Sequence, residues 1–280
     1  MYTLNCKGNL LNITQPVVMG IINSTPDSFY ANSRADNVDL AVETASKMIS
    51  AGASIIDIGG QSTRPGSAIV SEIEEINRVL PIINAIRTVF PDIIISIDTF
   101  YPSVAKQAVE NGANMVNDIS GGLYHADMLT TVGSLKVPYI CMYSSSTAAT
   151  MHEKNILGNI TEEAIQYFNE RIYACKLAGI TDLILDPGIG FSKTMEQNFQ
   201  LIKELEVLKI YNLPILMGIS RKSLIYKTLH QLPEESLNGT TVLNTVALMK
   251  GASILRVHDV KEAIEAILLL AVLNKTPCTS

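Results

Sequence analysis

The chain has 280 residues, of which 47% are hydrophobic and only 17% are charged, and its formal net charge is −6. This composition excludes a disordered chain and suits a large buried core. The negative charge argues against nucleic acid and anionic membranes as partners, so an anionic substrate would need a few well-placed cations.

The cysteines and the start of the sequence predict a cytoplasmic protein. No apolar run approaches the roughly 18 residues of a membrane span, and the polar residues of Asn9-Leu-Leu-Asn12 interrupt what would be the core of a signal peptide. Cys6, Cys141, Cys175 and Cys278 show no CxxC and no metal spacing, which is typical of reduced thiols.

Eight short apolar segments, taken in chain order, predict the strands of one parallel sheet. They are rich in Ile, Leu, Val or Met and too apolar for a sheet with one face in water. Parallel strands that are buried on both faces have this composition. The expected strands lie near residues 17–22, 52–57, 93–98, 114–117, 136–141, 183–186, 213–217 and 254–258.

Four of these strands follow one pattern, in which a helix ends at a glycine and a polar residue ends the strand that follows. Glycine is the expected stop signal because it adopts the left-handed conformation without strain. In three of the four, the polar residue comes five places after the glycine, so these strands deliver it at the same height. The four segments are residues 52–57, 112–117, 179–186 and 251–256.

Apolar residues at helical spacing predict helices between the strands. Leu40 is expected on the buried side of the first and Ile73 on that of the second. Asn159 or Thr161 is available as the N-cap of a later one. The expected helices cover residues 38–51, 72–89, 102–111, 161–178 and 263–273.

Eight alternating β and α units predict an α/β fold, a single (β/α)8 TIM barrel that forms one domain over residues 1–280. The structural alternative is a doubly wound open sheet, which usually has fewer strands and a glycine-rich first turn. Residues 23–36 and 59–70 form connections longer than the usual length of about 2–6 residues, which indicates functional loops.

Polar side chains end several of the apolar strands, and this pattern predicts a site. Asp98, Asn117 and Asp186 each follow such a strand, where an unpaired polar group would cost about 1–7 kcal/mol. Because the carboxyl ends of barrel strands meet at one face, the three side chains would form a hydrogen-bonding set for a flat, nitrogen-rich ring. Each could instead be a helix cap or a turn residue, so the prediction depends on the three together.

Cationic residues follow the last two strands, where a barrel site would hold an anion. Lys222 lies where a strand gives way to a helix, next to Ser223, and Arg256 and His258 lie two residues apart at the next strand end. A solvated Lys and a satisfied core His are the alternatives to an anion site.

Seven motifs follow one another along the chain. They are Asn23-Ser-Thr-Pro-Asp-Ser-Phe29, Ser62-Thr-Arg-Pro-Gly66, Ser96-Ile-Asp-Thr99, Asn117-Asp-Ile-Ser-Gly121, Asp186-Pro-Gly-Ile-Gly-Phe191, Ser220-Arg-Lys222 and Arg256-Val-His-Asp259. They stand in the order found in dihydropteroate synthases, and the chain resembles that family over roughly residues 4–275. The resemblance implies a transferase of folate biosynthesis that joins 6-hydroxymethyl-7,8-dihydropterin pyrophosphate to 4-aminobenzoate and releases 7,8-dihydropteroate and pyrophosphate.

The resemblance also implies roles for the site residues. Asp98, Lys222, Arg256 and His258 would be catalytic, and Asp98 would stabilise positive charge on the pterin as pyrophosphate leaves. Asn23 would bind Mg2+, the expected cofactor, which neutralises the leaving group. The residues implied in substrate binding are Thr63, Arg64, Pro65, Asp98, Asn117, Met142, Asp186, Phe191, Lys222, Ser223, Arg256 and His258.

Within this set, the resemblance assigns the two substrates to different parts of the site. Asp186 would hold the amino edge of the pterin, Lys222 the opposite side, and Met142 would pack on the ring face. The two long loops would close over aminobenzoate, with Phe29 on the first loop and the carboxylate at Ser223.

Three positions depart from the family's motifs. Tyr30-Ala31-Asn32 stands where the family commonly has Ser-Asp-Gly, Gln61 where it has Glu, and Tyr143 where it has His. One alternative function is a methyltetrahydrofolate:corrinoid methyltransferase domain, which would share the pterin-binding residues but has no use for Arg256 and His258. The other is a catalytically silent pterin-binding protein, which only the altered first loop supports.

The helix expected over residues 263–273 predicts a homodimer, and so does the resemblance. This segment is apolar nearly all round, whereas a barrel helix needs one apolar stripe facing the strands. Leu269 and Val272 would therefore remain to be covered, and an exposed apolar patch usually marks an interface.

Overall fold

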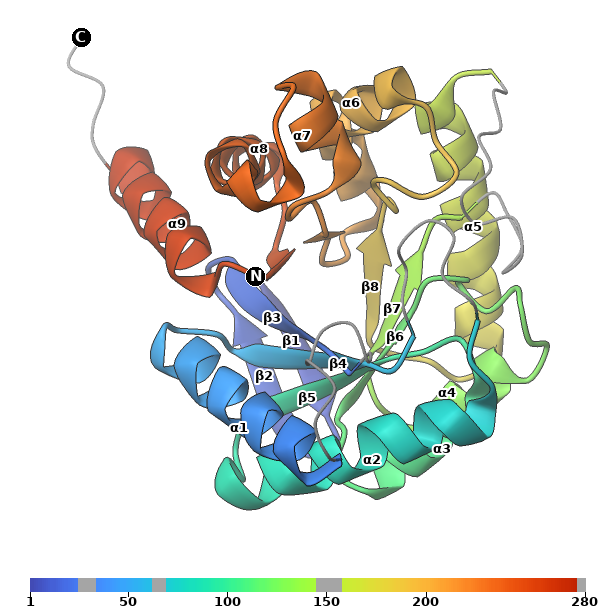
Figure 1. Ribbon diagram of the computed structural model, residues 1–280. Coiled ribbons are helices and arrows are strands. Elements are labelled where there is room, and N and C mark those ends of the chain that lie inside the picture. The colour runs from blue at the N-terminus through green and yellow to red at the C-terminus, as the bar shows by residue number, and fades with distance from the viewer. Residues whose placement is uncertain (25–33, 62–68, 145–157, 276–280) are drawn as a thin grey trace, which may run out of the picture.

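Eight parallel strands form the wall of a barrel, and helices surround it (Figure 1). The computed structural model describes residues 1–24, 34–61, 69–144 and 158–275. The predicted TIM barrel is confirmed, with each strand within a few residues of its expected place. The strands of the wall are β3 (Val17–Asn23), β4 (Ile55–Gly59), β5 (Ile94–Asp98), β6 (Met115–Asp118), β7 (Tyr139–Met142), β8 (Leu183–Asp186), β9 (Leu216–Met217) and β10 (Ile254–Val257).

The strands follow one another around the barrel almost in chain order. Their spatial order is β8-β7-β6-β5-β4-β3-β10-β9. A parallel bridge between Leu185 and Ile215 joins the first of these strands to the segment before the last, so the sheet closes on itself. Closure brings the carboxyl ends of all eight strands to one face of the molecule.

Helices cover the outside of the barrel. Asn159 is the N-cap of the helix that follows it, because its side chain accepts a hydrogen bond from the backbone N–H of Thr161. The helices are α1 (Arg34–Ser50), α2 (Glu72–Val89), α3 (Pro102–Glu110), α4 (Met128–Leu135), α5 (Ile160–Leu177), α6 (Met195–Lys203), η2 (Leu205–Tyr211), α7 (Ser223–Thr228), η3 (Pro233–Glu235), α8 (Leu237–Lys250) and α9 (Val260–Lys275). In the described part of the chain, none of them is long and apolar enough to cross a membrane.

Two side chains expected on buried helix faces are in fact exposed. Leu40 on α1 is 41% exposed and Ile73 on α2 is 74% exposed, so both predictions were wrong. Ala45 and Ile83 on the same two helices are fully buried. The face of each helix that meets the barrel is narrower than its run of apolar residues.

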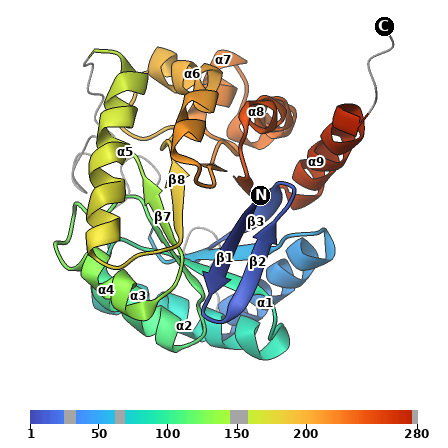
Figure 2. The ribbon, with the colours of Figure 1, turned by 180° about the vertical axis from the view of Figure 1, so that it is seen from behind.

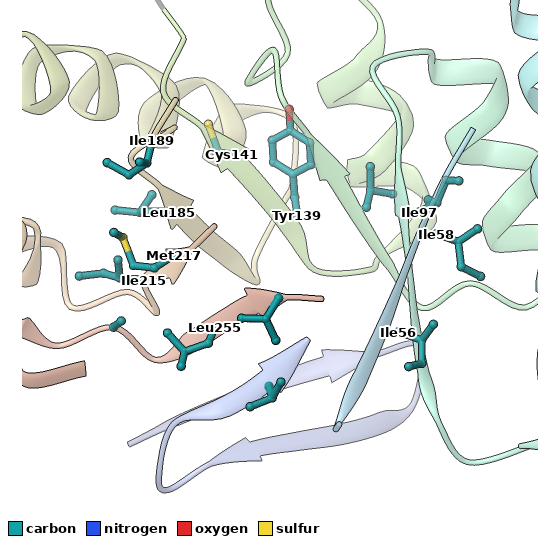
Figure 3. Packing of buried hydrophobic residues seen from close by; sticks show 14 of the residues in the cluster. Ile56, Ile58, Ile97, Tyr139, Cys141, Leu185, Ile189, Ile215, Met217 and Leu255 are labelled. Atoms are coloured by element: carbon teal, nitrogen blue, oxygen red, sulfur yellow. The ribbon is translucent and has the colours of Figure 1, made fainter. Parts of the chain in front are cut away.

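Strand residues that point outward form the main hydrophobic core with the helices. Figure 3 shows part of this layer, including Ile56, Ile97, Leu185 and Leu255 from four different strands. Gly251 ends α8 with φ of 106°, as the glycine pattern predicts, and the chain turns directly into β10. Gly52, Gly112 and Gly179 also have positive φ, so the same device precedes four of the strands.

An antiparallel hairpin covers the amino-terminal end of the barrel, and we did not predict it. It consists of β1 (Tyr2–Cys6) and β2 (Asn9–Ile13) and appears as two blue strands in Figure 2. Leu4, Cys6, Leu11 and Ile13 lie at alternate positions and face the barrel, where they pack on a ring of apolar strand residues. We call this ring the lower layer; its members are Met19, Ile55, Ile94, Met115, Ile140, Ile184, Leu216 and Ile254.

Candidate active site

Asn117, Asp186 and Arg256 lie directly above the lower layer, because each follows a lower-layer residue by two positions and side chains on one face of a strand recur every two residues. Asp98 lies one step higher, four residues after Ile94. Strand register sets their heights. Gly59, Asp98 and Asn117 are in register on β4, β5 and β6, and Met142 is in register with Asp186 across β7 and β8. The structure therefore brings Asp98, Asn117 and Asp186 to the same end of the barrel, as predicted.

Arg256 on β10 reaches across the barrel to two carboxylates. Its Nε donates to Oδ2 of Asp57 and its Nη2 donates to Oδ2 of Asp98, both at 2.6 Å. The Nδ2 of Asn117 also donates to Oδ2 of Asp57, at 3.2 Å. Charge-assisted bonds of this length are strong, so side chains from four strands, β4, β5, β6 and β10, form one connected network.

Asp57 is therefore a central member of the site, although it was absent from the predicted set. The signal was present in the sequence, because Asp57 follows Gly52 at the same spacing as Asn117 follows Gly112. Its side chain is fully buried, at the height of Ser96 on the neighbouring strand.

Asp186 and Lys222 meet around the turn that follows β8. Oδ1 of Asp186 accepts a hydrogen bond from the backbone N–H of Gly188 at 2.7 Å. Lys222 donates to the backbone carbonyl of Ile189, and its Nζ lies 4.5 Å from the centre of the Phe191 ring. Gly190 has φ of 88°, and a Cβ there would stand 2.9 Å from Cδ of Lys222. The glycines of this turn thus let the lysine lie against the backbone.

An apolar wall stands beside the polar groups. Met142 is buried, and Phe191 is partly buried against the small cluster that Met142 forms with Phe100 and Ile119. The predicted site residues thus include both a hydrogen-bonding edge and a flat apolar surface, which are the two features that a planar heterocycle requires.

The segment after β9 is tied to the segment after β10. Oγ of Ser220 lies 3.0 Å from Nδ1 of His258, and Arg221 forms a two-bond ion pair with Asp259 at 2.9 and 2.7 Å. Arg221 has a positive φ of 55°, and the ion pair holds it there. Ser223 begins α7, so the predicted anion-binding residues Lys222, Ser223, Arg256 and His258 lie on two linked segments.

Burial and neighbouring charges both shift the pKa values of the site residues. Burial raises the pKa of Asp98 to about 7; Arg256 opposes the shift and Asp57 adds to it. Burial also raises the pKa of Asp186, against the attraction of Lys222. For Arg256, the carboxylates of Asp57 and Asp98 outweigh burial and raise the pKa.

The two other cations of the site lose basicity. Burial lowers the pKa of Lys222 to about 8, although the carboxylate of Asp186 opposes this. Partial loss of hydration lowers the pKa of His258 to about 4, and the positive charge of Arg256 adds to the effect. His258 is therefore a neutral imidazole at pH 7 in the ligand-free chain, and it can accept or donate a hydrogen bond.

A buried lysine behind the apolar wall was also absent from the prediction. Lys193 donates to the backbone carbonyls of Tyr143, Gly188 and Phe191 at 3.3, 2.9 and 3.0 Å. Its Nζ lies 4.5 Å from the centre of the Tyr143 ring, and the hydroxyl of Tyr143 donates to Glu163 at 3.1 Å. The Tyr that replaces the family's His thus packs behind the site, where it supports Lys193.

Gln61 holds the two ends of the second long loop together. Its Nε2 donates to the backbone carbonyl of Val70, and its Oε1 accepts from the backbone N–H of Val70, both at 3.0 Å. The same Nε2 donates to Oε2 of the buried Glu75 at 2.8 Å. A glutamate at position 61 could donate to Glu75 only if it carried a proton, so the amide removes that requirement.

Asn23 ends β3, and the neighbouring Gly59 leaves space between it and Asp98. A Cβ at Gly59 would stand 3.8 Å from Oδ1 of Asn23 and 3.6 Å from Oδ2 of Asp98. Within the described residues, no group of three His, Cys, Asp or Glu side chains could hold a metal. The amide oxygen of Asn23 suits Mg2+, which usually keeps several waters and binds substrate phosphates with few protein ligands.

Some predicted site residues lie outside the described part of the chain. Thr63, Arg64 and Pro65 belong to residues 62–68, and Phe29 and Ala31 belong to residues 25–33. The two loops expected to close over the second substrate are these same segments. The described site therefore comprises the strand ends and the segments around α7.

Comparison with known proteins places this geometry in a family. The model of the family described as "Pterin binding enzyme" matches residues 19–258. The dihydropteroate synthase of Escherichia coli (strain K12) is 42% identical over 265 residues, which cover 94% of this chain and 93% of that protein.

Two solved structures are similar over nearly their whole length. The dihydropteroate synthase of Xanthomonas albilineans with 4-aminobenzoic acid has a TM-score of 0.91 and 35% identity, and the match covers 98% of this chain and 99% of the other. The enzyme of Yersinia pestis, solved as a sulfonamide drug complex, has a TM-score of 0.91 and 37% identity, with 98% and 100% covered.

Proposed function

This chain belongs to the dihydropteroate synthases, a family of pterin-binding transferases of the folate pathway, and from that premise we propose how its residues carry out the reaction. The substrates are 6-hydroxymethyl-7,8-dihydropterin pyrophosphate and 4-aminobenzoate, and the products are 7,8-dihydropteroate and pyrophosphate. The observation that carries the proposal is the network of Asp57, Asp98, Asn117 and Arg256 above the apolar lower layer.

The pterin ring lies among the strand ends in this proposal. Asp186 accepts hydrogen bonds from the amino edge of the ring, Lys222 donates to the opposite side, and Asn117 and Asp98 take the remaining ring nitrogens. Met142 and Phe191 supply apolar surface for the ring faces, in agreement with the cluster in which they pack. The carboxylate of Asp98 stabilises positive charge that spreads into the ring as the C–O bond to pyrophosphate breaks.

The leaving pyrophosphate lies on the cationic segments. Arg256 and His258 bind it together with Thr63 and Arg64 of the second long loop. Neutral His258 donates one N–H while Ser220 holds the other ring nitrogen, consistent with their 3.0 Å contact. Asn23 would hold Mg2+, which supplies positive charge to the phosphate oxygens when it is bound.

Aminobenzoate then attacks the methylene carbon with its amine nitrogen. Its carboxylate meets the start of α7 at Ser223, where backbone N–H groups are unpaired within the helix. Release of pyrophosphate by the purified protein, supplied with both substrates and Mg2+, tests the proposal. A protein that binds the pterin substrate but releases no pyrophosphate would contradict it.

The order of binding gives a second test. We propose that aminobenzoate binds well only after the pterin and pyrophosphate are in place with Mg2+, because its site depends partly on the two long loops. Equal affinity for the ligand-free protein would contradict ordered assembly. Sulfonamides carry an aniline and an anionic end, so they should compete with aminobenzoate; non-competitive inhibition would count against the shared site.

The chain forms a homodimer through α8 and α9 in this proposal. The two helices lie side by side in both ribbon views (Figures 1 and 2). They expose an apolar surface, which we call the α8–α9 face, consisting of Val242, Met249, Leu268, Leu269, Val272 and Leu273, each more than half exposed. A cytoplasmic location is also proposed, supported by the free, buried thiols of Cys6, Cys141 and Cys175.

A further inference from the structure

Asp57 is a buried carboxylate whose partners are two side chains of the site. It is 0% exposed and lies on β4 between β3 and β5. Its Oδ2 accepts from Nε of Arg256 at 2.6 Å and from Nδ2 of Asn117 at 3.2 Å. Within the described residues, its Oδ1 is buried and has no hydrogen-bond partner.

Such a group is costly to the fold. A buried carboxylate with one unpaired oxygen loses hydration that no partner restores. Apolar side chains fill the layer below, and every other buried polar group in the network faces Arg256 or another member of the network. The stability of the barrel therefore does not account for a carboxylate at this position. Its contacts with the side chains of Arg256 and Asn117 do account for it.

The guanidinium of Arg256 keeps donors available in this arrangement. Asp57 binds Nε, the end nearest the strand, and Asp98 binds Nη2. The Nη1 group and one hydrogen of Nη2 can still donate to a further acceptor, because a guanidinium is a planar fork with several donors. Holding Nε fixes the plane of that fork, and with it the direction of the remaining donors.

We propose that Asp57 is a positioning residue of this reaction: it orients the guanidinium of Arg256 toward the pyrophosphate and the amide of Asn117 toward the pterin. The inference rests on the proposed function, since it assumes that these two side chains contact the pterin substrate. Asp57 itself acts through them and touches neither reacting atom.

The test is Asp57→Asn in the full-length chain, with 6-hydroxymethyl-7,8-dihydropterin pyrophosphate and Mg2+ titrated by calorimetry in the absence of aminobenzoate. An amide keeps the shape and one acceptor but removes the charge that fixes Arg256. Binding should weaken about 10- to 100-fold, the loss typical when the partner that orients a ligating side chain is removed. The stoichiometry should stay at the wild-type value, and the KM for aminobenzoate should not change.

Two other results would overturn the inference. Tighter binding by Asp57→Asn would mean that the carboxylate sequesters Arg256 rather than orienting it. Unchanged affinity with a reduced stoichiometry would mean that Asp57 only maintains the folded fraction. Ser96→Ala is the matched control, because Ser96 is in register with Asp57 and its buried hydroxyl has no partner within the described residues; its binding should equal that of the wild type.

A second background keeps the inference testable if Asp57→Asn alone fails to fold. Arg256→Ala and the double variant with Asp57→Asn contain no unpaired cation next to position 57, and they can be compared with each other. In this background Asp57→Asn should weaken binding by less than about 10-fold, since the guanidinium that Asp57 orients is absent and residues that act as a unit are not additive. A loss of about 10-fold or more between these two variants would overturn the positioning role.

The wild-type chain separates this inference from the proposed function. If it neither binds the pterin substrate nor releases pyrophosphate with both substrates, the proposed function fails and this inference fails with it. If it does both and Asp57→Asn behaves identically, only the inference fails.

Discussion

On several strands the inside of the barrel changes character within two residues. On β8, Ile184 packs in the lower layer, and Asp186 lies in the site above it. The same step separates Ile55 from Asp57 on β4 and Ile254 from Arg256 on β10. Below, apolar contact stabilises the fold; above, buried charges cost stability and are held by one another. A rigid apolar base thus carries a site whose groups need not move to meet a ligand.

Ile184→Ala should give the largest effect, on the lower side of this comparison. Removing most of a buried side chain leaves a cavity and lowers the free energy of unfolding by about 2–5 kcal/mol. Denaturant titration measures the loss, and Ile184→Val is a milder control with an expected cost of about 0.5–1.5 kcal/mol. The affinity of the folded protein for the pterin substrate should not change; a large change would mean that the two layers are not separable.

Asp186→Asn is the counterpart on the upper side of the same strand. The amide would present a donor to the donors on the pterin edge, and such a mismatch costs about 1–3 kcal/mol of binding free energy or more. Calorimetry should show the loss, while the free energy of unfolding stays close to that of the wild type. Unaltered pterin affinity in this variant would remove Asp186 from the ring-binding set.

The pH dependence of catalysis sharpens the comparison, because the upper layer contains groups that titrate near neutrality, whereas the apolar side chains of the lower layer do not titrate. Burial lowers the pKa of Lys222 to about 8, against the opposing charge of Asp186. In the proposed function the ammonium of Lys222 binds the ring, so kcat/KM should fall as pH rises above about 8. In Lys222→Arg, which keeps its charge, activity is expected to be lower but without this basic limb.

The expected decline in kcat/KM cannot result from a loss of stability caused by deprotonation of Lys222. The folded chain loses this proton above about pH 8, whereas a lysine in the unfolded chain keeps it to the ordinary value of 10.5. Between these two values the unfolded state binds more protons, so the contribution of Lys222 to stability rises with pH. Retention of the basic limb in Lys222→Arg would show that another group is responsible.

Leu269→Glu should have the smallest effect on a single chain, because it changes neither layer of the barrel. Leu269 is 72% exposed on α9, and surface substitutions usually alter stability by less than about 0.5 kcal/mol. Light scattering at micromolar concentration should show a dimer for the wild type and a monomer for the variant. A monomeric wild type would contradict the proposed α8–α9 face. Lys261→Glu, on the same helix with a side chain 74% exposed, is a control for added charge.

The apolar runs of the sequence were sufficient to predict the eight strands, and the polar residues that end several of them predicted the end of the barrel at which the described site lies. A glycine stop precedes four of these strands, in three of them at a fixed spacing from the polar strand end. Asp57 satisfied the same spacing, so its omission was a failure to apply the pattern. Lys193 left no such signal, since its partners are backbone carbonyls and a lysine two residues after Phe191 looks like a solvated one.

The hairpin and the helix faces show two further features that the sequence pattern did not predict. The alternation of Leu4, Cys6, Leu11 and Ile13 around Lys7-Gly8 is a strand signal, but this hairpin is antiparallel and lies outside the repeating β and α units on which the prediction depended. The predicted burial of Leu40 and Ile73 was wrong because a helix with apolar residues on several sides does not reveal which side packs against the barrel. Only the packed structure decides that.

The same hairpin determines how molecules travel through the catalytic cycle. With Leu4, Cys6, Leu11 and Ile13 sealing the amino-terminal end, every substrate must arrive and every product must depart over the carboxyl ends of the strands. In the proposed arrangement the pterin lies among the strand ends and aminobenzoate under the long loops, so the pterin has to enter first and dihydropteroate, which contains that ring, has to leave last. Aminobenzoate that binds first would block the entry of the pterin substrate, so a large excess of aminobenzoate should slow turnover. The two-strand hairpin on the far side of the barrel thereby leaves the site with a single entrance, which both substrates and both products must share.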